Sequence, residues 1–189
     1  MSAQDSKLFV ISGPSGAGKG TLVTRVRERR SNLGLTVSAT TRAPRKGEVD
    51  GVNYFFMTRE EFARRVANGE FVEWAEVHGN CYGTLVSEVT SKLASGASLI
   101  LEIDVQGALQ VKERFPEAVL IFIKPPSLEV LRERLVGRGT ETPETIELRM
   151  ANAADELALA DRYDDVVVND DLDRATDELV RVLDMHERI

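Results

Sequence analysis

A short apolar segment near the amino terminus runs directly into a glycine-rich loop that contains a lysine. Residues 8–11 read LFVI and residues 13–20 read GPSGAGKG, which fits the spacing G-x-x-x-x-G-K. Glycines in this pattern let consecutive backbone N–H groups turn inward toward phosphate oxygens, and a helix predicted to start near Gly18 adds its positive end. The sequence therefore predicts a buried strand, a phosphate-binding loop and a helix, in the order in which this motif has that function.

The lysine and the residues after it indicate how the loop would hold a nucleotide. Lys19 is predicted to lie against the β- and γ-phosphates, which a turn that only joins strand to helix would not require. Gly20 lacks the Ser or Thr hydroxyl that usually binds Mg²⁺, so nucleotide oxygens and water, with Asp104 nearby, are expected to hold the ion. Thr21 can touch the α-phosphate. The loop residues expected to bind the nucleotide are Gly13, Pro14, Ser15, Gly16, Ala17, Gly18, Lys19, Gly20 and Thr21.

Buried-strand patterns alternate with helical patterns along most of the chain. Further apolar runs occur at residues 98–103, 119–123 and 166–168, and helix-period segments follow them at 105–115, 127–137 and 172–186. Strands that are covered on both faces read as continuous apolar runs, and their alternation with helices is typical of a parallel sheet. The predicted fold class is therefore α/β, with a doubly wound parallel sheet and helices on both faces.

Two segments interrupt this alternation. Residues 35–86 contain short aromatic strands and several turn signals, and we interpret them as an inserted, partly antiparallel subdomain. Residues 138–147 begin with arginine and glycine and lead into a helix with Pro143 at its first position, which predicts a short lid. A single domain over residues 5–186 is expected, with a core made of residues 5–34, 87–137 and 148–186.

Charge and cysteine content exclude several classes of protein. The 189 residues include 24 Lys and Arg against 31 Asp and Glu, a net charge of −7 that disfavours a nucleic-acid polymer as partner. The single cysteine, Cys81, cannot form an intrachain disulfide, and with two histidines it is too little for a metal-ligand cluster. The sequence has no signal-peptide pattern and no apolar run that could span a membrane, which predicts a cytoplasmic protein without a membrane partner.

Cations and hydroxyls gather in the inserted segment although the chain is acidic. Arg42 and Arg45 can present forked donors to one phosphate group, and Tyr54 and Tyr82 can add hydroxyl donors to the same group. Because the glycine-rich loop already accounts for one nucleotide, these residues predict a second, phosphorylated substrate that acts as the acceptor.

The segment FVEWAEV at residues 71–77 places a carboxylate in a strand pattern. Strict alternation would put Phe71 and Glu73 on one face and Trp74 on the other, with Trp74 in the core of the insert. Guanine presents N1–H and N2–H₂ side by side, and a carboxylate accepts both, whereas adenine has an acceptor at N1 and no 2-amino group. Glu73 therefore predicts a preference for guanine. The residues that could complete the contacts to the base are Ser38, Thr84 and Asp104.

Taken together, the motifs resemble those of the guanylate kinases, a family of nucleoside-monophosphate kinases. The resemblance covers about residues 7–183 and rests on G-P-S-G-x-G-K, S-x-T-T-R-x-x-R-x-G-E-x-x-G-x-x-Y-x-F, F-x-E-W-A, G-x-x-Y-G-T, D-x-Q-G, P-P-S, R-L-x-G-R-G-T-E and V-N-D-D-L. It implies a P-loop kinase core with helices on both faces, a small inserted α+β subdomain that binds the nucleoside monophosphate, and a short lid.

The resemblance also implies roles for individual residues. The residues implied to be catalytic are Lys19, Arg42, Arg134, Arg138 and Arg149. Those implied to bind GMP are Ser38, Arg42, Arg45, Tyr54, Glu73, Tyr82, Thr84 and Asp104. ATP is implied to bind on the glycine-rich loop with its adenine beside Asn169. Arg134 and Arg138 lie four residues apart on one predicted helix, so both can face the transferred phosphoryl group.

The reaction implied by the resemblance is a reversible phosphoryl transfer from ATP to GMP or dGMP with Mg²⁺ as cofactor, in purine nucleotide metabolism. Two other functions remain open: a non-catalytic module that binds phosphorylated peptides at the GMP site, and a kinase of a phosphorylated sugar. The complete loop with Lys19 disfavours the first, and Glu73 would be superfluous in the second. The oligomeric state and the choice between ATP and GTP as donor also remain open.

Overall fold

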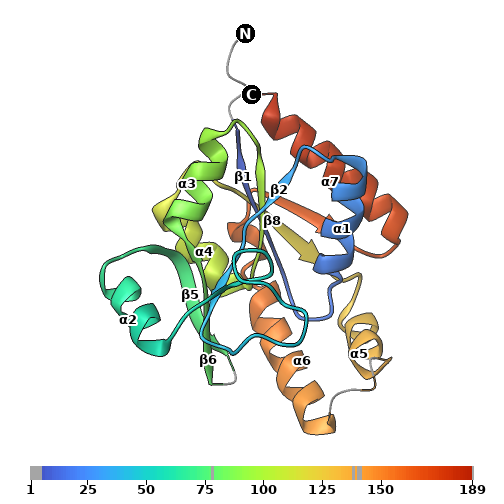
Figure 1. The fold of residues 1–189 in the computed structure, drawn as a ribbon. Coiled ribbons are helices and arrows are strands. Elements are labelled where there is room, and N and C mark those ends of the chain that lie inside the picture. The colour runs from blue at the N-terminus through green and yellow to red at the C-terminus, as the bar shows by residue number, and fades with distance from the viewer. Residues whose placement is uncertain (1–5, 78, 138, 140–141, 189) are drawn as a thin grey trace.

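A five-stranded parallel sheet forms the centre of the molecule (Figure 1). The computed structural model describes residues 6–77, 79–137, 139 and 142–188. The strands lie in the order β2-β7-β1-β8-β9, and all neighbouring pairs run parallel. Their bounds are β1 Leu8–Ser12, β2 Gly34–Leu35, β7 Leu99–Glu102, β8 Val119–Lys124 and β9 Asp165–Val168. The predicted α/β class with a parallel sheet is confirmed.

Helices cover both faces of this sheet because the side chains of each strand alternate between the two faces. Phe9 and Ile11 of β1 pack in one core with α1 and α7, whereas Leu8 and Val10 pack in a second core with α3 and α4. These four side chains are at most 3% exposed, so the central strand is buried on both sides. The bounds of the covering helices are α1 Lys19–Arg29, α3 Val86–Ala94, α4 Val105–Arg114 and α7 Leu172–Glu187.

Two further helices, α5 (Leu128–Gly137) and α6 (Pro143–Leu157), pack against each other and lie together on one side of the sheet in Figure 1. Thr142 caps α6 by accepting a hydrogen bond from the backbone N–H of Thr145, and proline follows at the first helical position, as predicted. The later part of the predicted lid is therefore the start of α6. Arg138, Thr140 and Glu141, which belong to the same predicted lid, lie outside the described residues.

The insert contains a second sheet of four strands in the order β4-β3-β6-β5. Strand β6 runs antiparallel to β3 and β5, and β4 runs parallel to β3, which agrees with a partly antiparallel segment. Helices α2 and α3 were not expected from the sequence. Strand β2 joins the parallel sheet, so the expected boundary at residue 35 falls inside a core strand. The bounds in the insert are β3 Ala39–Thr40, β4 Phe55–Phe56, α2 Arg59–Ala67, β5 Phe71–Val77 and β6 Asn80–Leu85.

A β-bulge in β5 changes which side chains share a face. The pairing of β5 with β6 shifts register between Phe71 and Glu73, so the strict alternation expected from the sequence is wrong at this point. Phe71 and Trp74 both contact the ring of Phe62 in α2, with centroid distances of 4.3 and 6.3 Å. Val72 packs instead in the core beneath α4. Trp74 is 42% exposed, so the expectation that it lies in the core of the insert is also wrong.

The carboxyl-terminal helix α7 is tied to α1, the helix that follows the phosphate loop. Arg30, which follows α1 as its carboxyl cap, pairs with Asp184 at 2.8 Å and with Glu187, and Arg25 of α1 pairs with Asp173. Each exposed ion pair adds little stability by itself, but the row of pairs continues the apolar contact between the two helices. Within the residues that the structure describes, every helix falls short of the length and apolarity that a bilayer-spanning helix needs.

Candidate active site

The phosphate loop joins β1 to α1 at the carboxyl end of the central strand, where open α/β sheets bind ligands. Gly13, Gly16 and Gly18 have φ angles of +141°, +90° and +90°, which L side chains rarely adopt. A Cβ at Gly13 would lie 2.2 Å from the carbonyl oxygen of Ile123, and a Cβ at Gly18 would lie 2.4 Å from Asn169 Nδ2. Glycine is therefore required here for the backbone to pass this close to the ends of β8 and β9.

Lys19 opens α1 and lies over the loop. Its Nζ donates to the carbonyl oxygens of Gly13 at 2.5 Å and of Pro14 at 3.0 Å. The first turn of α1 contains no acidic residue, so no side chain of that turn offsets the positive end of the helix dipole. The loop encloses a hollow of about 310 Å³, lined by Ser15, Gly16, Gly18, Lys19, Gly20, Thr21 and Glu102. This hollow has the donors and the positive potential that bound phosphate groups require.

Glu102 is the carboxylate in this hollow, and it is not among the site residues expected from the sequence. It ends β7, in register with Ile11 of β1, and its two carboxylate oxygens lie 3.5 and 3.6 Å from where a Cβ on Gly20 would be. Burial raises the pKa of Glu102, and the charge of Lys19 opposes the rise. Asp104 was the carboxylate expected near the ion, but Glu102 is the one that lines the loop. Its place at the end of an apolar run is the signal that could have identified it.

Arginines from α5 and α6 reach the loop and the end of β9. Arg149 of α6 donates from Nη1 to the hydroxyl of Ser15. Arg134 of α5 donates from Nη2 to the carbonyl oxygen of Asn169 at 2.8 Å, and its Nη1 is buried without a hydrogen-bond partner in the described part of the chain. Arg138, the third arginine implied on these elements, lies outside the described residues. The two described arginines thus border the loop from the side of α5 and α6.

Asn169, predicted to lie beside adenine, supports the phosphate loop directly. It is 6% exposed, and its Nδ2 donates to the carbonyl oxygen of Ala17 at 2.8 Å. The backbone N–H of Asn169 donates a hydrogen bond to the carbonyl oxygen of Lys124, which fixes Asn169 at the carboxyl ends of β8 and β9. The side-chain amide therefore holds the loop backbone in this structure.

Glu73 is a buried carboxylate on the insert. It is 8% exposed, and burial raises its pKa to about 7; the charge of Asp104 adds to the rise, while the nearby Thr84 opposes it. Thr84 lies opposite Glu73 in the pairing of β5 with β6. The Thr84 hydroxyl is fully buried, and no hydrogen bond of normal geometry within the described residues satisfies it. A carboxylate and a hydroxyl that are buried side by side in this way suit a ligand that brings its own hydrogen-bond groups.

Asp104 connects the insert to the parallel core. It caps α4, where its Oδ1 accepts a hydrogen bond from the backbone N–H of Gly107 at 2.8 Å. A Cβ on Gly107 would lie 3.3 Å from Glu73 Oε2 and 3.5 Å from Asp104 Oδ1, so both carboxylates approach this glycine. Gly107, the glycine of the D-x-Q-G motif, is a second residue without a role expected from the sequence. Its missing side chain leaves room for the two carboxyl groups.

The phosphate-binding residues expected in the insert gather around Arg42. The Arg42 guanidinium lies 5.4 Å from the ring centroid of Tyr54, and the Tyr54 ring lies 6.2 Å edge-on from that of Tyr82. Arg42 also pairs with Glu48, at a distance of 2.8 Å. The side chain of Arg45 is exposed, three residues further along the chain. Ser38 precedes β3, and its carbonyl oxygen accepts a hydrogen bond from the backbone N–H of Phe55 in β4.

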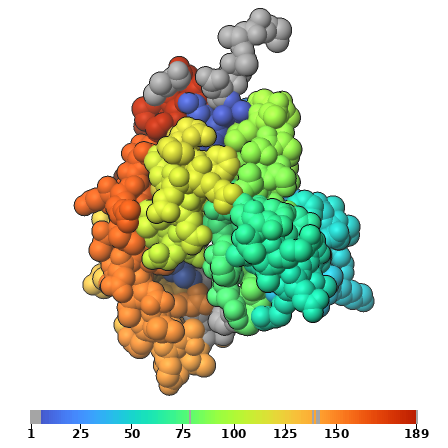
Figure 2. Space-filling model, turned by 90° about the vertical axis from the view of Figure 1, so that its left-hand side faces the viewer, coloured from blue at the N-terminus to red at the C-terminus, as the bar shows by residue number. Residues whose placement is uncertain are grey.

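The two groups of residues face a common space. Glu156 of α6 lies close enough to both groups for their charges to act on it. Burial raises the pKa of Glu156, the charge of Lys19 opposes the rise, and the charge of Asp104 adds to it. Figure 2 shows a hollow between the insert, α4 and α6, with the amino-terminal segment visible at its floor. Lys19 of the phosphate loop and Asp104 at the start of α4 therefore both act on Glu156, a relation between distant segments that no local sequence pattern contains.

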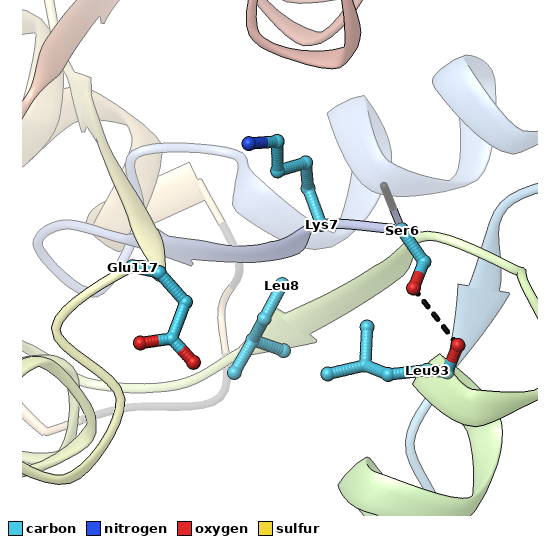
Figure 3. A pocket seen from close by; sticks show the side chains of 5 residues that line it. All are labelled: Ser6, Lys7, Leu8, Leu93 and Glu117. Atoms are coloured by element: carbon cyan, nitrogen blue, oxygen red, sulfur yellow. Dashed lines mark hydrogen bonds between the residues drawn. The ribbon is translucent and has the colours of Figure 1, made fainter. Parts of the chain in front are cut away.

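A different hollow opens at the amino end of β1 (Figure 3). It measures about 320 Å³ and is lined by Ser6, Lys7, Leu8, Leu93 and Glu117. The Ser6 hydroxyl donates to the carbonyl oxygen of Leu93 at 2.8 Å, and Lys7 and Leu8 point to opposite sides of the strand (Figure 3). Because this hollow lies at the end of the sheet opposite the phosphate loop, Lys7 and Glu117 are suitable control positions.

The chain is similar to known proteins over nearly its whole length. A model of the guanylate kinase family matches residues 5–186. The chain is 56% identical to a guanylate kinase from Gloeobacter violaceus, over 94% of this chain and 87% of that protein. It is 52% identical to a guanylate kinase from Halalkalibacterium halodurans, over 97% of this chain and 90% of that protein. The crystal structure of guanylate kinase from Anaplasma phagocytophilum gives a TM-score of 0.74 at 36% identity, covering 97% of this chain and 87% of that one.

Proposed function

Since the chain belongs to the guanylate kinase family and phosphorylates GMP with ATP, we propose that its phosphate loop binds ATP while the insert and Asp104 bind GMP. The observation that carries this assignment is the buried pair of Glu73 and Thr84, which faces α4 at the edge of the space that the phosphate loop also borders. Glu73 accepts the N1–H and N2–H₂ of guanine, and Asp104, Ser38 and Thr84 complete the contacts to the base. No observation favours the phosphopeptide module or the sugar kinase.

On the donor side, the chain's own groups bind and orient the triphosphate. The backbone N–H groups of the loop and the start of α1 receive the β- and γ-phosphates, and Lys19 moves from the loop carbonyls to the phosphate oxygens. Arg149 and Arg134, with Arg138, stabilise the charge that spreads over the transferred group. Asn169 keeps the loop in place and borders the adenine.

On the acceptor side, Arg42, Arg45, Tyr54 and Tyr82 hold the phosphate of GMP so that one of its oxygens attacks in line with the departing ADP. This oxygen belongs to an ionised phosphate, so no general base is required. GMP and dGMP both fit because none of the assigned contacts involves the 2′-hydroxyl. The division into core, insert and a lid at residues 138–147 is part of the same proposal.

Mg²⁺ fits the hollow beside the loop as an ion that arrives with ATP. The described residues contain no group of three or more His, Cys, Asp or Glu that could hold a metal by themselves. They do place the Glu102 carboxylate beside Gly20 and Thr21, and hard oxygen donors of this kind suit Mg²⁺ together with phosphate oxygens and water. When bound, Mg²⁺ neutralises charge on the β- and γ-phosphates. We assign Glu102 to this position because it lies where the loop lacks its usual hydroxyl.

Changing Glu102 to glutamine is expected to raise the Mg²⁺ concentration for half-maximal rate and to lower kcat, each by about tenfold or more, as for other residues that orient a metal ion. The KM for GMP should stay the same because Glu73 and Arg42 are untouched. A coupled assay of ADP release over a Mg²⁺ titration measures both effects. Glu117→Gln, at the opposite end of the sheet, is the matched control. An unchanged Mg²⁺ dependence in Glu102→Gln would remove Glu102 from the ion site.

The proposed function is tested by measuring ADP release with GMP, dGMP, AMP, CMP and UMP at one ATP and Mg²⁺ concentration. We expect turnover of GMP and dGMP and less than about one part in 10³ of that rate with the other three, because a buried carboxylate facing a base without matching donors loses its hydrogen bonds. Equal turnover of AMP and GMP would contradict the role of Glu73. No turnover of any of them would favour the binding module.

A further inference from the structure

Glu48 lies at the centre of the acceptor-phosphate group without a role in the reaction described so far. Its two carboxylate oxygens accept hydrogen bonds from Arg42 Nη2 at 2.8 and 3.0 Å. One of them also accepts from the backbone N–H of Arg45 at 2.7 Å, and the backbone N–H of Glu48 returns a hydrogen bond to the Arg45 carbonyl oxygen at 3.0 Å. A single carboxylate thus binds the side chain of one phosphate-binding arginine and the backbone of the other.

The contact holds Arg42 in one orientation. The side chains of Arg42 and Glu48 are only 15% and 19% exposed, so water screens the pair less than it screens a surface ion pair. Arg42 Nη1 donates to the carbonyl oxygen of Ala43 at 2.8 Å, and the guanidinium lies 5.4 and 5.9 Å from the ring centroids of Tyr54 and Phe56. The Arg42 side chain, which would rotate freely without these partners, is therefore held by contacts on several sides.

The fixed guanidinium keeps donors for a ligand. An arginine has five N–H groups, and the contacts to Glu48 and Ala43 use at most three of them. The Tyr82 side chain also interacts with the guanidinium, and the remaining donors can bind phosphate oxygens beside it. The pKa of Glu48 is lowered, with the hydrogen bond from Arg42 as the main cause, and the pKa of Arg42 is raised by the same contact. Both groups are therefore fully charged at neutral pH.

We propose that Glu48 is a positioning residue of the acceptor-phosphate site, which holds the Arg42 guanidinium and the turn at Arg45 in the geometry that receives the phosphate of GMP. The inference rests on the proposed function of this site. Ordering a long side chain costs conformational entropy, and a site that is ordered beforehand avoids this cost when the ligand binds. The negative charge of Glu48 also repels a phosphate. Its three hydrogen bonds from Arg42 and Arg45 direct that charge toward the arginines, so we expect positioning to outweigh repulsion.

The test compares Glu48→Gln and Glu48→Ala with Glu61→Gln. Glu61 pairs with Arg65 at 2.9 Å in α2 of the same insert, so this control also breaks a Glu–Arg pair but leaves Arg42 alone. We expect the KM for GMP to rise about tenfold or more in the Glu48 variants, with kcat and the KM for ATP within about threefold of the unmodified chain. Guanosine, which lacks the phosphate, should inhibit the variants and the unmodified chain equally. An unchanged or lower KM for GMP in Glu48→Gln would overturn the proposal.

A double-mutant cycle separates positioning from a general structural effect. If Glu48 acts through Arg42, adding Glu48→Gln to Arg42→Lys should raise the KM for GMP by less than about twofold, because lysine cannot keep the forked contact. If the KM for GMP in the double variant rises by the product of the two single-variant factors, Glu48 and Arg42 act independently and the proposal is overturned. This test does not depend on whether Glu48→Ala folds. Failure of the assignment on which this inference rests is distinguishable, because Arg42→Lys alone would then leave the KM for GMP unchanged.

Discussion

Replacing Lys19 by methionine is expected to lower kcat for GMP phosphorylation by about 10³-fold, the size of loss seen when one group that stabilises transition-state charge is removed. Methionine keeps most of the side-chain volume and removes the ammonium group that lies over the loop, 2.5 Å from the Gly13 carbonyl oxygen. Phosphoryl transfer depends mainly on positioning and charge stabilisation, so the chemical step should suffer more than substrate binding. Steady-state assays with varied ATP and GMP measure kcat and both KM values.

Lys7→Met is the matched control, because it makes the same chemical change at the amino end of β1 and leaves the loop intact. Its kcat should equal that of the unmodified chain. The KM for GMP should change less than about threefold in Lys19→Met, since Lys19 belongs to the donor side. A kcat within tenfold of the original would show that Lys19 does not stabilise the transferred group, and the loop would then serve binding alone.

Changing Glu73 to glutamine is expected to abolish most GMP phosphorylation and, at the same time, to stabilise the fold above neutral pH. Glutamine presents an N–H₂ group where guanine presents its own donors, so kcat/KM for GMP should fall by about 10³-fold or more. The kcat/KM for AMP should fall by a smaller factor than that for GMP. ADP-release assays with both monophosphates measure the ratio, and Glu76→Gln, at an exposed position on the same strand, is the matched control.

The stability effect follows from the sign of the pKa shift. The pKa of Glu73 rises from 4.5 to about 7 in the folded chain, so the folded state holds this proton more tightly than the unfolded state does. Ionisation of Glu73 therefore costs stability as the pH rises from about 4.5 to about 7, and the full cost of about 3 kcal/mol applies above that pH. Glutamine is neutral throughout. Glu73→Gln should be more stable by about this amount at pH 8, and the difference should shrink as the pH falls toward 4.5.

Urea unfolding at several pH values between 5.5 and 8.5 measures this difference. The same proton affects binding, because guanine requires the ionised carboxylate. The KM for GMP should therefore rise by up to about tenfold for each pH unit below 7, and Glu73→Gln should lack this dependence. The pH dependence that Glu73→Gln retains measures protonation of the GMP phosphate itself, and it is subtracted from that of the unmodified chain. A variant that is less stable than the unmodified chain at pH 8 would contradict a buried, ionisable carboxylate at this position.

Much of the fold could be predicted because it depends on local patterns. The apolar runs at β1, β7 and β8 are buried on both faces, and each is followed by a helix. The run at β9 lies at the edge of the sheet and leaves Val166 40% exposed, so the burial on both faces expected for it is wrong. The phosphate loop is equally local, since its positive φ angles and the close approach of Gly13 to Ile123 exclude other residue types. The helices α2 and α3 escaped prediction because their short apolar faces pack against the insert and the core edge, and no long period marks them.

Local patterns in the chain specify the strand–loop–helix unit, the succession of strands and helices along the sequence, and the kinds of side chain available to the site. The position of each carboxylate in the site depends on tertiary pairing between strands. The register of β7 against β1 brings Glu102 to the loop, and the bulge in β5 separates Phe71 from Glu73 and lets the carboxylate face α4. The spacing of the motif does not show that Glu48 pairs with Arg42, and the contact appears only in the folded chain. These relations depend on pairing between distant segments, where a shift of one residue moves a side chain to the opposite face.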